Sequence, residues 1–347
     1  KHLNGFQKLF KMNTNDISSI FEAAQLVNGI AIQYCTDDNR NLADLALIMH
    51  ENQFLNCLEK FLSEYIENKT FLDMKFAQPF IVLASRYVQI RSKMVSLTET
   101  KYLGMNIELI LNLYSSILMA GPAINNKKQQ FTTLSADLYS SRSIISQSIQ
   151  QNCPQFVFLA SEYMKSKKMS LLDPFLFFLS DYFSFNSIDS NLIKDLNDNL
   201  IEFFDITLLT ESTIMSKAII NILVQLCEKV PIELLNDLIA SIIIQLSTQM
   251  KNYLSSKEAP RNATKILYIL GQVSGSPRGK ISIISNSKIH GLCGELHTIL
   301  CDKEIASKNK YLTIVSLQLT TNLICPSITL NKNLDLILRC GSELLPS

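Results

Sequence analysis

Apolar residues recur at three- and four-residue spacing along almost the whole chain, which is the period of an α-helix. Residues 17–31 and residues 107–117 each contain such an apolar stripe. There is no sustained two-residue alternation, and no turn signal of the β-hairpin type separates two apolar runs. The pattern therefore predicts an all-α fold with no sheet.

Prolines support the same division into helices, because almost all of them fall between apolar stretches or in a first turn. Pro79 is expected to start or kink its helix. With boundaries good to about two to four residues, the predicted helices are 16–35, 40–50, 53–67, 76–94, 99–120, 131–151, 154–168, 171–184, 189–209, 211–229, 231–254, 259–274, 280–286, 288–301, 305–324 and 331–345.

Many of these helices are apolar on more than one side, as in residues 234–250. A helix that lies between neighbours on both sides has this pattern, whereas a helix wet on one face does not. Repeat proteins grow in length without splitting into domains. We therefore expect residues 1–347 to form a single continuous α-solenoid domain of about six to eight helical repeats. The start at Lys1 and the helical pattern running almost to Ser347 favour a fragment of a larger protein.

Composition indicates a globular chain, with 47% hydrophobic and 18% charged residues. The formal net charge is +1, from 32 basic and 31 acidic residues. Nucleic-acid binding depends mostly on neutralising phosphates, so this balance makes it the outsider among the possible functions. The densest basic clusters, at 125–130 and 165–168, are interpreted as solvated loops.

Eight cysteines are spread singly through the chain, with no CxxC pair. This distribution favours free buried thiols in a reducing compartment. We therefore expect an intracellular protein of the cytoplasm or nucleus that is not secreted.

The most lipid-like run, residues 170–185, is interrupted by Asp173, Pro174 and Asp181. It falls short of the ~20 apolar residues that span a bilayer. Asp173 is expected to be an N-cap and Pro174 the first helical position. The run predicts a buried helix of a soluble protein without membrane insertion.

Residues 287–301 place His290, Cys293, His297 and Cys301 at spacings that resemble those of metal ligands. On a regular helix the first and last of these lie about 16 Å apart, whereas zinc needs ligands at about 2 Å. The four residues therefore cannot form one site on one helix. We expect no metal and interpret this face as packing on the next repeat.

No catalytic set emerges from the remaining motifs. In the segment 275–281, three residues separate Gly275 from Gly279 and Ile281 follows Lys280. A phosphate-binding loop needs four residues between its glycines and a Ser or Thr after the lysine. We expect a turn here, no catalytic residues, no cofactor and no small-molecule substrate.

Residues 259–324 resemble armadillo repeats. Residues 279–285 look like the short first helix, 286–288 like the turn, 289–301 like the second helix, and 304–324 like the long third helix that ends in a Leu-x-Asn-Leu-like pattern. The family often has Gly at the turn. Asn286, the first residue of the turn here, also tolerates left-handed backbone angles.

Residues 41–89 offer the same succession of helices, and residues 212–231 resemble another third helix. The segment 120–210 departs from the pattern. HEAT repeats follow the same physics, so the resemblance covers an armadillo- or HEAT-type solenoid. It implies a right-handed superhelix whose third helices line a concave surface.

The resemblance also suggests partner-binding residues. Asn322 matches the family's characteristic asparagine, which in some members fixes the backbone of a bound peptide, and Gln225 and Gln272 take the corresponding places. An amide suits this task because it both donates and accepts hydrogen bonds. The alternative is that these amides cap neighbouring helices.

These observations predict a non-catalytic scaffold or adaptor that binds a protein partner, as an extended peptide or a helix, on the solenoid surface. The alternative is a structural or regulatory module of a larger complex component. Nucleic-acid binding through a basic groove is the outsider, and it would need Lys and Arg clustered on the concave face.

Overall fold

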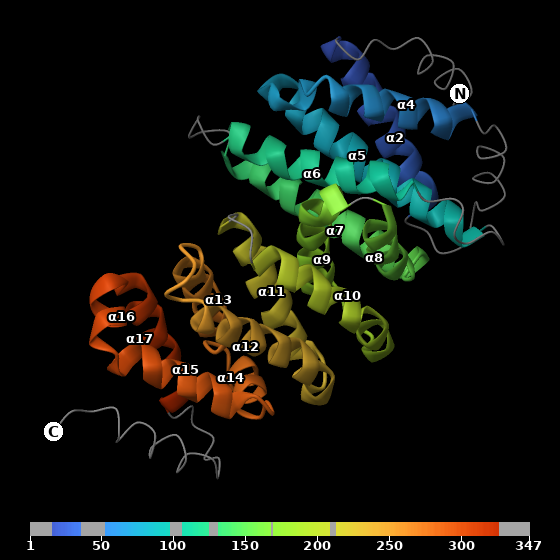
Figure 1. Ribbon diagram of the computed structural model, residues 1–347. Coiled ribbons are helices and arrows are strands. Elements are labelled where there is room, and N and C mark those ends of the chain that lie inside the picture. The colour runs from blue at the N-terminus through green and yellow to red at the C-terminus, as the bar shows by residue number, and fades with distance from the viewer. Residues whose placement is uncertain are drawn as a thin grey trace. The chain divides into compact units, whose positions relative to one another are not determined.

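The computed structural model describes residues 16–35, 53–97, 106–124, 131–167, 169–208 and 213–325 (Figure 1). Within these ranges the regular structure is entirely helical and no strand occurs, which confirms the predicted all-α class. None of the described helices is both long enough and apolar enough to cross a membrane. The chain divides into two compact units, Lys1–Asn186 and Ser187–Ser347. That the whole chain is one continuous solenoid domain stays a prediction.

The first unit consists of two rows of helices (Figure 1). In one row α5 packs between α2 and α7, and in the other α6 packs between α4 and α9. The helices are α2 (Ile17–Cys35), α4 (Gln53–Glu67), α5 (Met74–Leu97), α6 (Ile107–Ile124), α7 (Phe131–Asn152), α8 (Phe156–Lys167) and α9 (Leu172–Phe185), with short 3-10 turns at Thr70–Leu72 and Met169–Leu171.

Aromatic side chains fill the centre of the first unit. Phe175, Phe178 and Phe183 of α9 are fully buried, which confirms that the apolar run 170–185 is a core helix. The ring of Phe178 meets that of Tyr114 edge to face, with 5.6 Å between centroids. Such aromatic contacts add about 0.5–1.5 kcal/mol beyond the burial of area.

The start of α9 differs from the prediction. The helix begins at Leu172 and its N-cap is Leu171, so Asp173 and Pro174 lie inside the first turn. The preceding 3-10 turn, Met169–Leu171, runs directly into α9, so the N-cap position falls on the last residue of that turn. Pro174 is tolerated because the first N–H groups of a helix have no partner within the helix.

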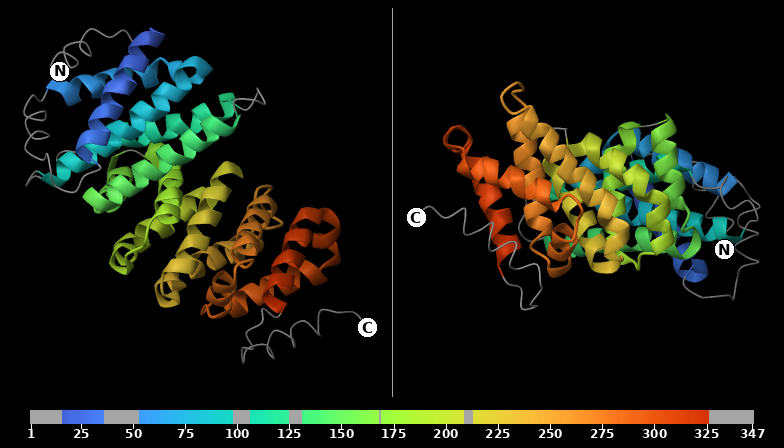
Figure 2. Two further views of the ribbon diagram at one scale, coloured as in Figure 1. Left: turned by 180° about the vertical axis from the view of Figure 1, so that it is seen from behind. Right: turned by 60° about the horizontal axis from the view of Figure 1, so that its bottom comes forward.

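The second unit also has two rows (Figure 2). We call them the α11–α13–α17 row, in which α13 packs between α11 and α17, and the α10–α12–α15 row, in which α12 packs between α10 and α15. The helices are α10 (Ser190–Leu208), α11 (Thr213–Lys229), α12 (Asn236–Lys251), α13 (Ala259–Val273), α14 (Pro277–Ile284), α15 (Ile289–Cys301), α16 (Lys303–Lys308) and α17 (Lys310–Ile324), with a 3-10 turn at Ile232–Leu235.

The structure divides the predicted helix 305–324 into α16 and α17. Asn309 separates them with φ −135° and ψ 82°, and its Oδ1 accepts a hydrogen bond from the N–H of Leu312. This contact is an N-cap, which gives α17 a defined start. The predicted helices 40–50 and 331–345 lie outside the described residues, and Pro79 lies inside α5, which starts before it at Met74.

The turn between α14 and α15 works differently from the expected left-handed turn. Lys69, with φ 52°, is the one non-glycine residue with positive φ in the described segments, so Asn286 does not use this conformation. The Asn286 side chain is instead buried, and its Nδ2 donates to the carbonyl oxygen of Asn236 at 2.8 Å. Its Oδ1 accepts from the N–H of Lys288 at 2.9 Å. Asn286 therefore ties the turn to the first residue of α12.

Candidate functional site

The C-terminal ends of the three helices in the α11–α13–α17 row are each closed by a side chain that is distant in the sequence. Arg278 donates to the carbonyl of Glu228 at 2.6 Å, and Lys280 Nζ donates to the carbonyl of Cys325. Asn322 Nδ2 donates to the carbonyl of Gly271 at 2.8 Å. The last carbonyls of a helix lack partners within the helix and carry partial negative charge, so donors and cations stabilise them.

Asn322, predicted to bind a partner, is one of these capping residues. Besides the Gly271 carbonyl, its Nδ2 contacts Ser274 Oγ at 3.2 Å, so the amide nitrogen joins α17 to the end of α13. These contacts are those of the alternative in which the amides cap neighbouring helices. Gln225 and Gln272 are half-buried on α11 and α13, and their side chains form no hydrogen bond to a described residue. Partner binding by the three amides stays a prediction.

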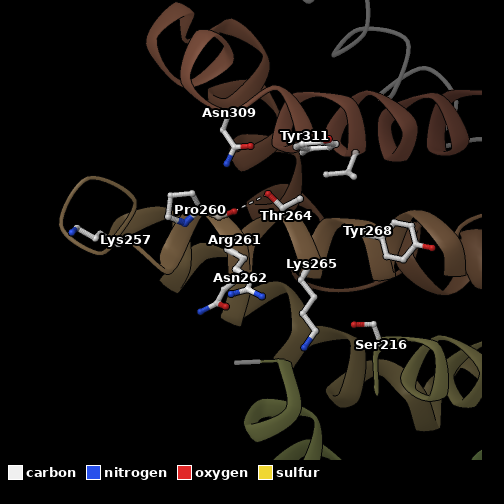
Figure 3. Close-up of a pocket in the computed structure, with 11 residues that line it drawn as sticks. Ser216, Lys257, Pro260, Arg261, Asn262, Thr264, Lys265, Tyr268, Asn309 and Tyr311 are labelled. Carbon is white, nitrogen blue, oxygen red and sulfur yellow. Dashed lines mark hydrogen bonds between the residues drawn. The ribbon is translucent and has the colours of Figure 1, made fainter. Parts of the chain in front are cut away.

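The row has two halves, one that contains the C-terminal ends of its helices and one that contains their starts. The half with the helix starts carries an open groove of about 590 Å³, within the range of ligand sites. α13 crosses its middle, α17 forms one side and α11 the other (Figure 3). We call it the α13 groove. Its lining residues are Ser216 of α11; Lys257, Pro260, Arg261, Asn262, Thr264, Lys265 and Tyr268 of α13 and the bend before it; and Asn309, Tyr311 and Val315 at the start of α17.

Lys257, Arg261 and Lys265 place three cationic side chains on the α13 groove. Arg261 and Lys265 lie one turn apart on α13, Lys257 lies in the bend before it, and the described lining residues include no carboxylate. Lys257 and Arg261 are exposed, and Lys265 is half-buried. Like charges four residues apart on a helix repel each other by a few tenths of a kcal/mol, about 0.2–0.5.

Lys265 also has a structural contact. Its Nζ donates to the carbonyl of Thr207, near the end of α10, at 2.8 Å. Burial, and then repulsion from Arg261, lower the pKa of Lys265 below its ordinary value. Lys265 therefore adds positive charge to the floor of the groove, while Lys257 and Arg261 provide the exposed cationic groups.

Aromatic and apolar side chains line the opposite end of the α13 groove. Tyr268 of α13 is 40% exposed, and Tyr311 of α17 is 77% exposed. Half-buried Val315 completes this end. Tyrosines that combine an exposed apolar ring with a hydroxyl are common anchors at protein interfaces.

Several polar side chains of the groove already form hydrogen bonds within the protein. Asn262 Nδ2 contacts Gln249 Oε1 at 3.3 Å, and Thr264 Oγ1 donates to the carbonyl of Pro260 at 2.7 Å. Asn309 uses its Oδ1 to cap α17. Its Nδ2 donates to no described residue and lies at the rim of the groove (Figure 3). Asn309 can therefore offer a donor to a bound chain.

The His/Cys stripe of α15 lies at the surface. His290, His297 and Cys301 are exposed and Cys293 is half-buried, while the apolar residues on the opposite side are buried. In the segments that the structure describes, no three His, Cys, Asp or Glu residues come together as metal ligands. The expected packing of this face on a further repeat is not seen within these segments.

The segment 275–281 is a turn only at residues 275–276, because α14 begins at Pro277, three residues before the predicted start at 280. Ser276 is the N-cap of α14, and its Oγ accepts from the N–H of Gly279 at 3.0 Å. A Cβ atom on Gly279 would lie 2.1 Å from the carbonyl oxygen of Val273. The glycine is therefore required by close approach of α14 to the end of α13.

The basic stripe is the functional feature that the sequence analysis missed. Contiguous clusters such as 125–130 draw attention in a sequence, whereas Lys257, Arg261 and Lys265 are separated by three residues each. Spacing of four residues places Arg261 and Lys265 one turn apart on α13, whereas Lys257 lies in the bend before the helix. A search for basic residues at helical spacing would have found the first two and missed Lys257.

Comparisons with protein-family models, with curated proteins and with solved structures find no match for this chain. Its function is therefore inferred from the geometry of its own residues.

Proposed function

We propose that the protein is a non-catalytic interaction scaffold that binds an extended segment of a partner protein across the α11–α13–α17 row. The observation that carries the proposal is the α13 groove, which crosses helices from three successive parts of the chain. An extended peptide suits such a surface, because it can contact several parallel helices in turn.

In this proposal the chain is a right-handed superhelical solenoid of armadillo or HEAT type. The α11–α13–α17 and α10–α12–α15 rows support it, since each helix in a row packs on the one before and the one after. The order α14, α15, α17 also matches the short, second and long third helices of an armadillo repeat. The α11–α13–α17 row would then be the ladder of third helices that lines the concave face.

A second candidate is a structural module within a larger assembly. The observation that favours it is the exposed apolar face of α17, where Ile314 and Leu317 are 58% and 51% exposed beside Tyr311. Apolar faces of this kind are usually covered in the functional state. In this case the covering element would be a neighbouring domain rather than a peptide in the groove.

The proposal is tested by affinity capture with variants of the two halves of the row. The tagged chain, Tyr268→Ala/Tyr311→Ala and Gln272→Ala/Asn322→Ala are compared in extracts of the source organism, with bound proteins quantified by mass spectrometry. Ile244→Ala is the control, because Ile244 is exposed on α12 in the other row.

We expect the tyrosine pair to lose at least one partner that the control retains. If only the amide pair loses a partner, the binding site lies instead at the C-terminal ends of these helices, where Gln272 and Asn322 were predicted to act. Partners unchanged by both pairs would contradict binding on this row and leave the structural module as the better interpretation.

A further inference from the structure

We infer that residues 331–345 of this chain form a further helix that packs on the exposed apolar face of α17. These residues lie outside the part of the chain that the structure describes. We call the surface that they would cover the outer face of α17, and it consists of Ile314, Leu317 and Thr321. Packing on the outer face is independent of partner binding at the α13 groove.

α17 has apolar side chains on two sides, and within the described residues only one side is covered. It packs against α13 and α15 through a single buried stripe, formed by Leu312, Ser316, Leu319 and Leu323. On the outer face, Ile314 is 58% exposed and Leu317 is 51% exposed. α13, which has a neighbour on each side in its row, instead buries Ile266, Leu267, Ile269 and Leu270. The sequence of α17 therefore fits a helix with neighbours on both sides.

The outer face of α17 is separate from the α13 groove. At about 100° per residue, Leu317 and the groove residue Val315 point about 160° apart around the helix. Ile314, Leu317 and Thr321 share one side, at three- and four-residue spacing. A helix can therefore pack on the outer face while the groove stays open.

The chain leaves α17 at a fixed point. Cys325 is the C-cap of α17, and its carbonyl accepts a hydrogen bond from Lys280 Nζ of α14. Pro326 follows and cannot continue the helix. Five residues, 326–330, separate this point from the predicted helix 331–345, and helices joined by about two to five residues pack as antiparallel neighbours.

Residues 331–345 have the length and the apolar pattern that the outer face requires. The predicted helix has the same 15 residues as α17, which corresponds to about 22 Å. Its apolar residues fall within an arc of about 100°, the width of a core-facing stripe, and are Leu334, Ile337, Leu338 and Leu345. The opposite side carries the charged residues Lys332, Arg339 and Glu343.

The connection also favours this segment over a second copy or another protein. A segment tethered by a short linker is held near its site at an effective concentration on the order of mM. A separate molecule competes for the outer face at its own, lower concentration. The occupant of the outer face is therefore the chain that follows α17.

The test uses the full chain with p-benzoylphenylalanine in place of Leu317, irradiated without a partner. Trypsin cleaves after Lys332 and Arg339, so residues 333–339 form a peptide of their own. We expect mass spectrometry to find this peptide joined to the one that contains position 317. The same replacement at Ile244, which is 50% exposed on α12, is the control and should give no such product.

Hydrogen exchange in α17 provides a second measurement. In Leu334→Asn/Leu338→Asn the amides of α17 should exchange about tenfold faster or more, because burial of one leucine side chain corresponds to roughly a factor of ten. Arg339→Asn/Glu343→Asn is the matched control, since it changes helix propensity similarly on the charged side and leaves the net charge unchanged. Its effect should be less than about twofold.

Three results would overturn the inference. A crosslinked dimer in place of the internal product would assign the outer face to a second copy. Failure of position 317 to crosslink to residues 333–339, or equal exchange in the two double variants, would show that the segment does not cover α17. The expected results would also remove the observation that favours the structural-module candidate, because the chain itself would then cover the apolar face.

Discussion

The two halves of the α11–α13–α17 row use similar side chains in opposite ways. At the C-terminal half, Arg278, Lys280 and Asn322 donate hydrogen bonds to the final carbonyls of the three helices. At the other half, Lys257 and Arg261 are exposed on the wall of a groove. Polar residues near the helix C-termini therefore serve stability, whereas the groove near the helix starts has exposed polar and aromatic side chains at its surface.

The largest effect on stability is expected for Gly279→Ala at the C-terminal half. The new Cβ would lie 2.1 Å from the carbonyl oxygen of Val273 and 2.7 Å from Ser276 Oγ, so the backbone of the turn must shift. We expect a loss of about 3 kcal/mol in the free energy of unfolding, measured by urea denaturation. Gly291→Ala is the matched control, because its Cβ would meet nothing within 4 Å inside α15.

That control should be stabilising by about 0.5–1 kcal/mol, since Ala is the better helix former. Equal effects of the two substitutions would contradict the close approach of α14 to α13.

A smaller loss is expected for Lys280→Met. Lys280 is 8% exposed and its Nζ donates to the carbonyl of Cys325, whereas Met retains the apolar stem and removes the donor. The free energy of unfolding should fall by about 1–2 kcal/mol. Lys303→Met, at an exposed position, should change it by less than about 0.5 kcal/mol. A Lys280 variant as stable as the Lys303 variant would show that the capping contact is unimportant.

Asn322→Ala tests the capping contact directly. Removal of Nδ2 leaves Ser274 Oγ as the remaining side-chain donor to the carbonyl of Gly271, so we expect a loss of about 1 kcal/mol in stability. Affinity for a peptide bound in the α13 groove should be unchanged. An Asn322 variant that keeps its stability and loses the peptide would reverse the roles of the two halves.

The smallest effects on stability are expected in the groove. Tyr311→Ser and Lys257→Ser alter exposed side chains, so each should change the free energy of unfolding by less than about 0.5 kcal/mol. The same variants should weaken binding of a captured partner. A large loss of stability in either would mean that these residues support the fold, and the comparison between the two halves would fail.

Helix positions followed from the sequence more readily than the roles of polar side chains. The second helix of the clearest repeat was predicted at 289–301, and α15 has these bounds, because apolar spacing is a local signal. The break at Asn309 was missed, since its capping contact depends on a side-chain conformation. Asn322 donates to Gly271, 51 positions away, and no local pattern reveals such a contact.

The candidate site was predicted only in part. The binding surface was predicted on the helices that resemble armadillo third helices, and the α13 groove lies on α11, α13 and α17, which are three of the helices with this resemblance. The predicted residues Gln225, Gln272 and Asn322 lie toward the C-terminal ends of these helices, and the groove lies toward their starts. The sequence pattern alone could not distinguish the two halves, because which carbonyls need a donor depends on how the helices pack.

The most direct measurement is site-specific photocrosslinking at two exposed positions of α17, Tyr311 in the groove and Thr321 beside Asn322. Each residue is replaced in turn by p-benzoylphenylalanine, and the chain is irradiated with a captured partner. We predict crosslinking to the partner at position 311 and little at position 321. Crosslinking at 321 and not at 311 would contradict the assignment of binding to the α13 groove.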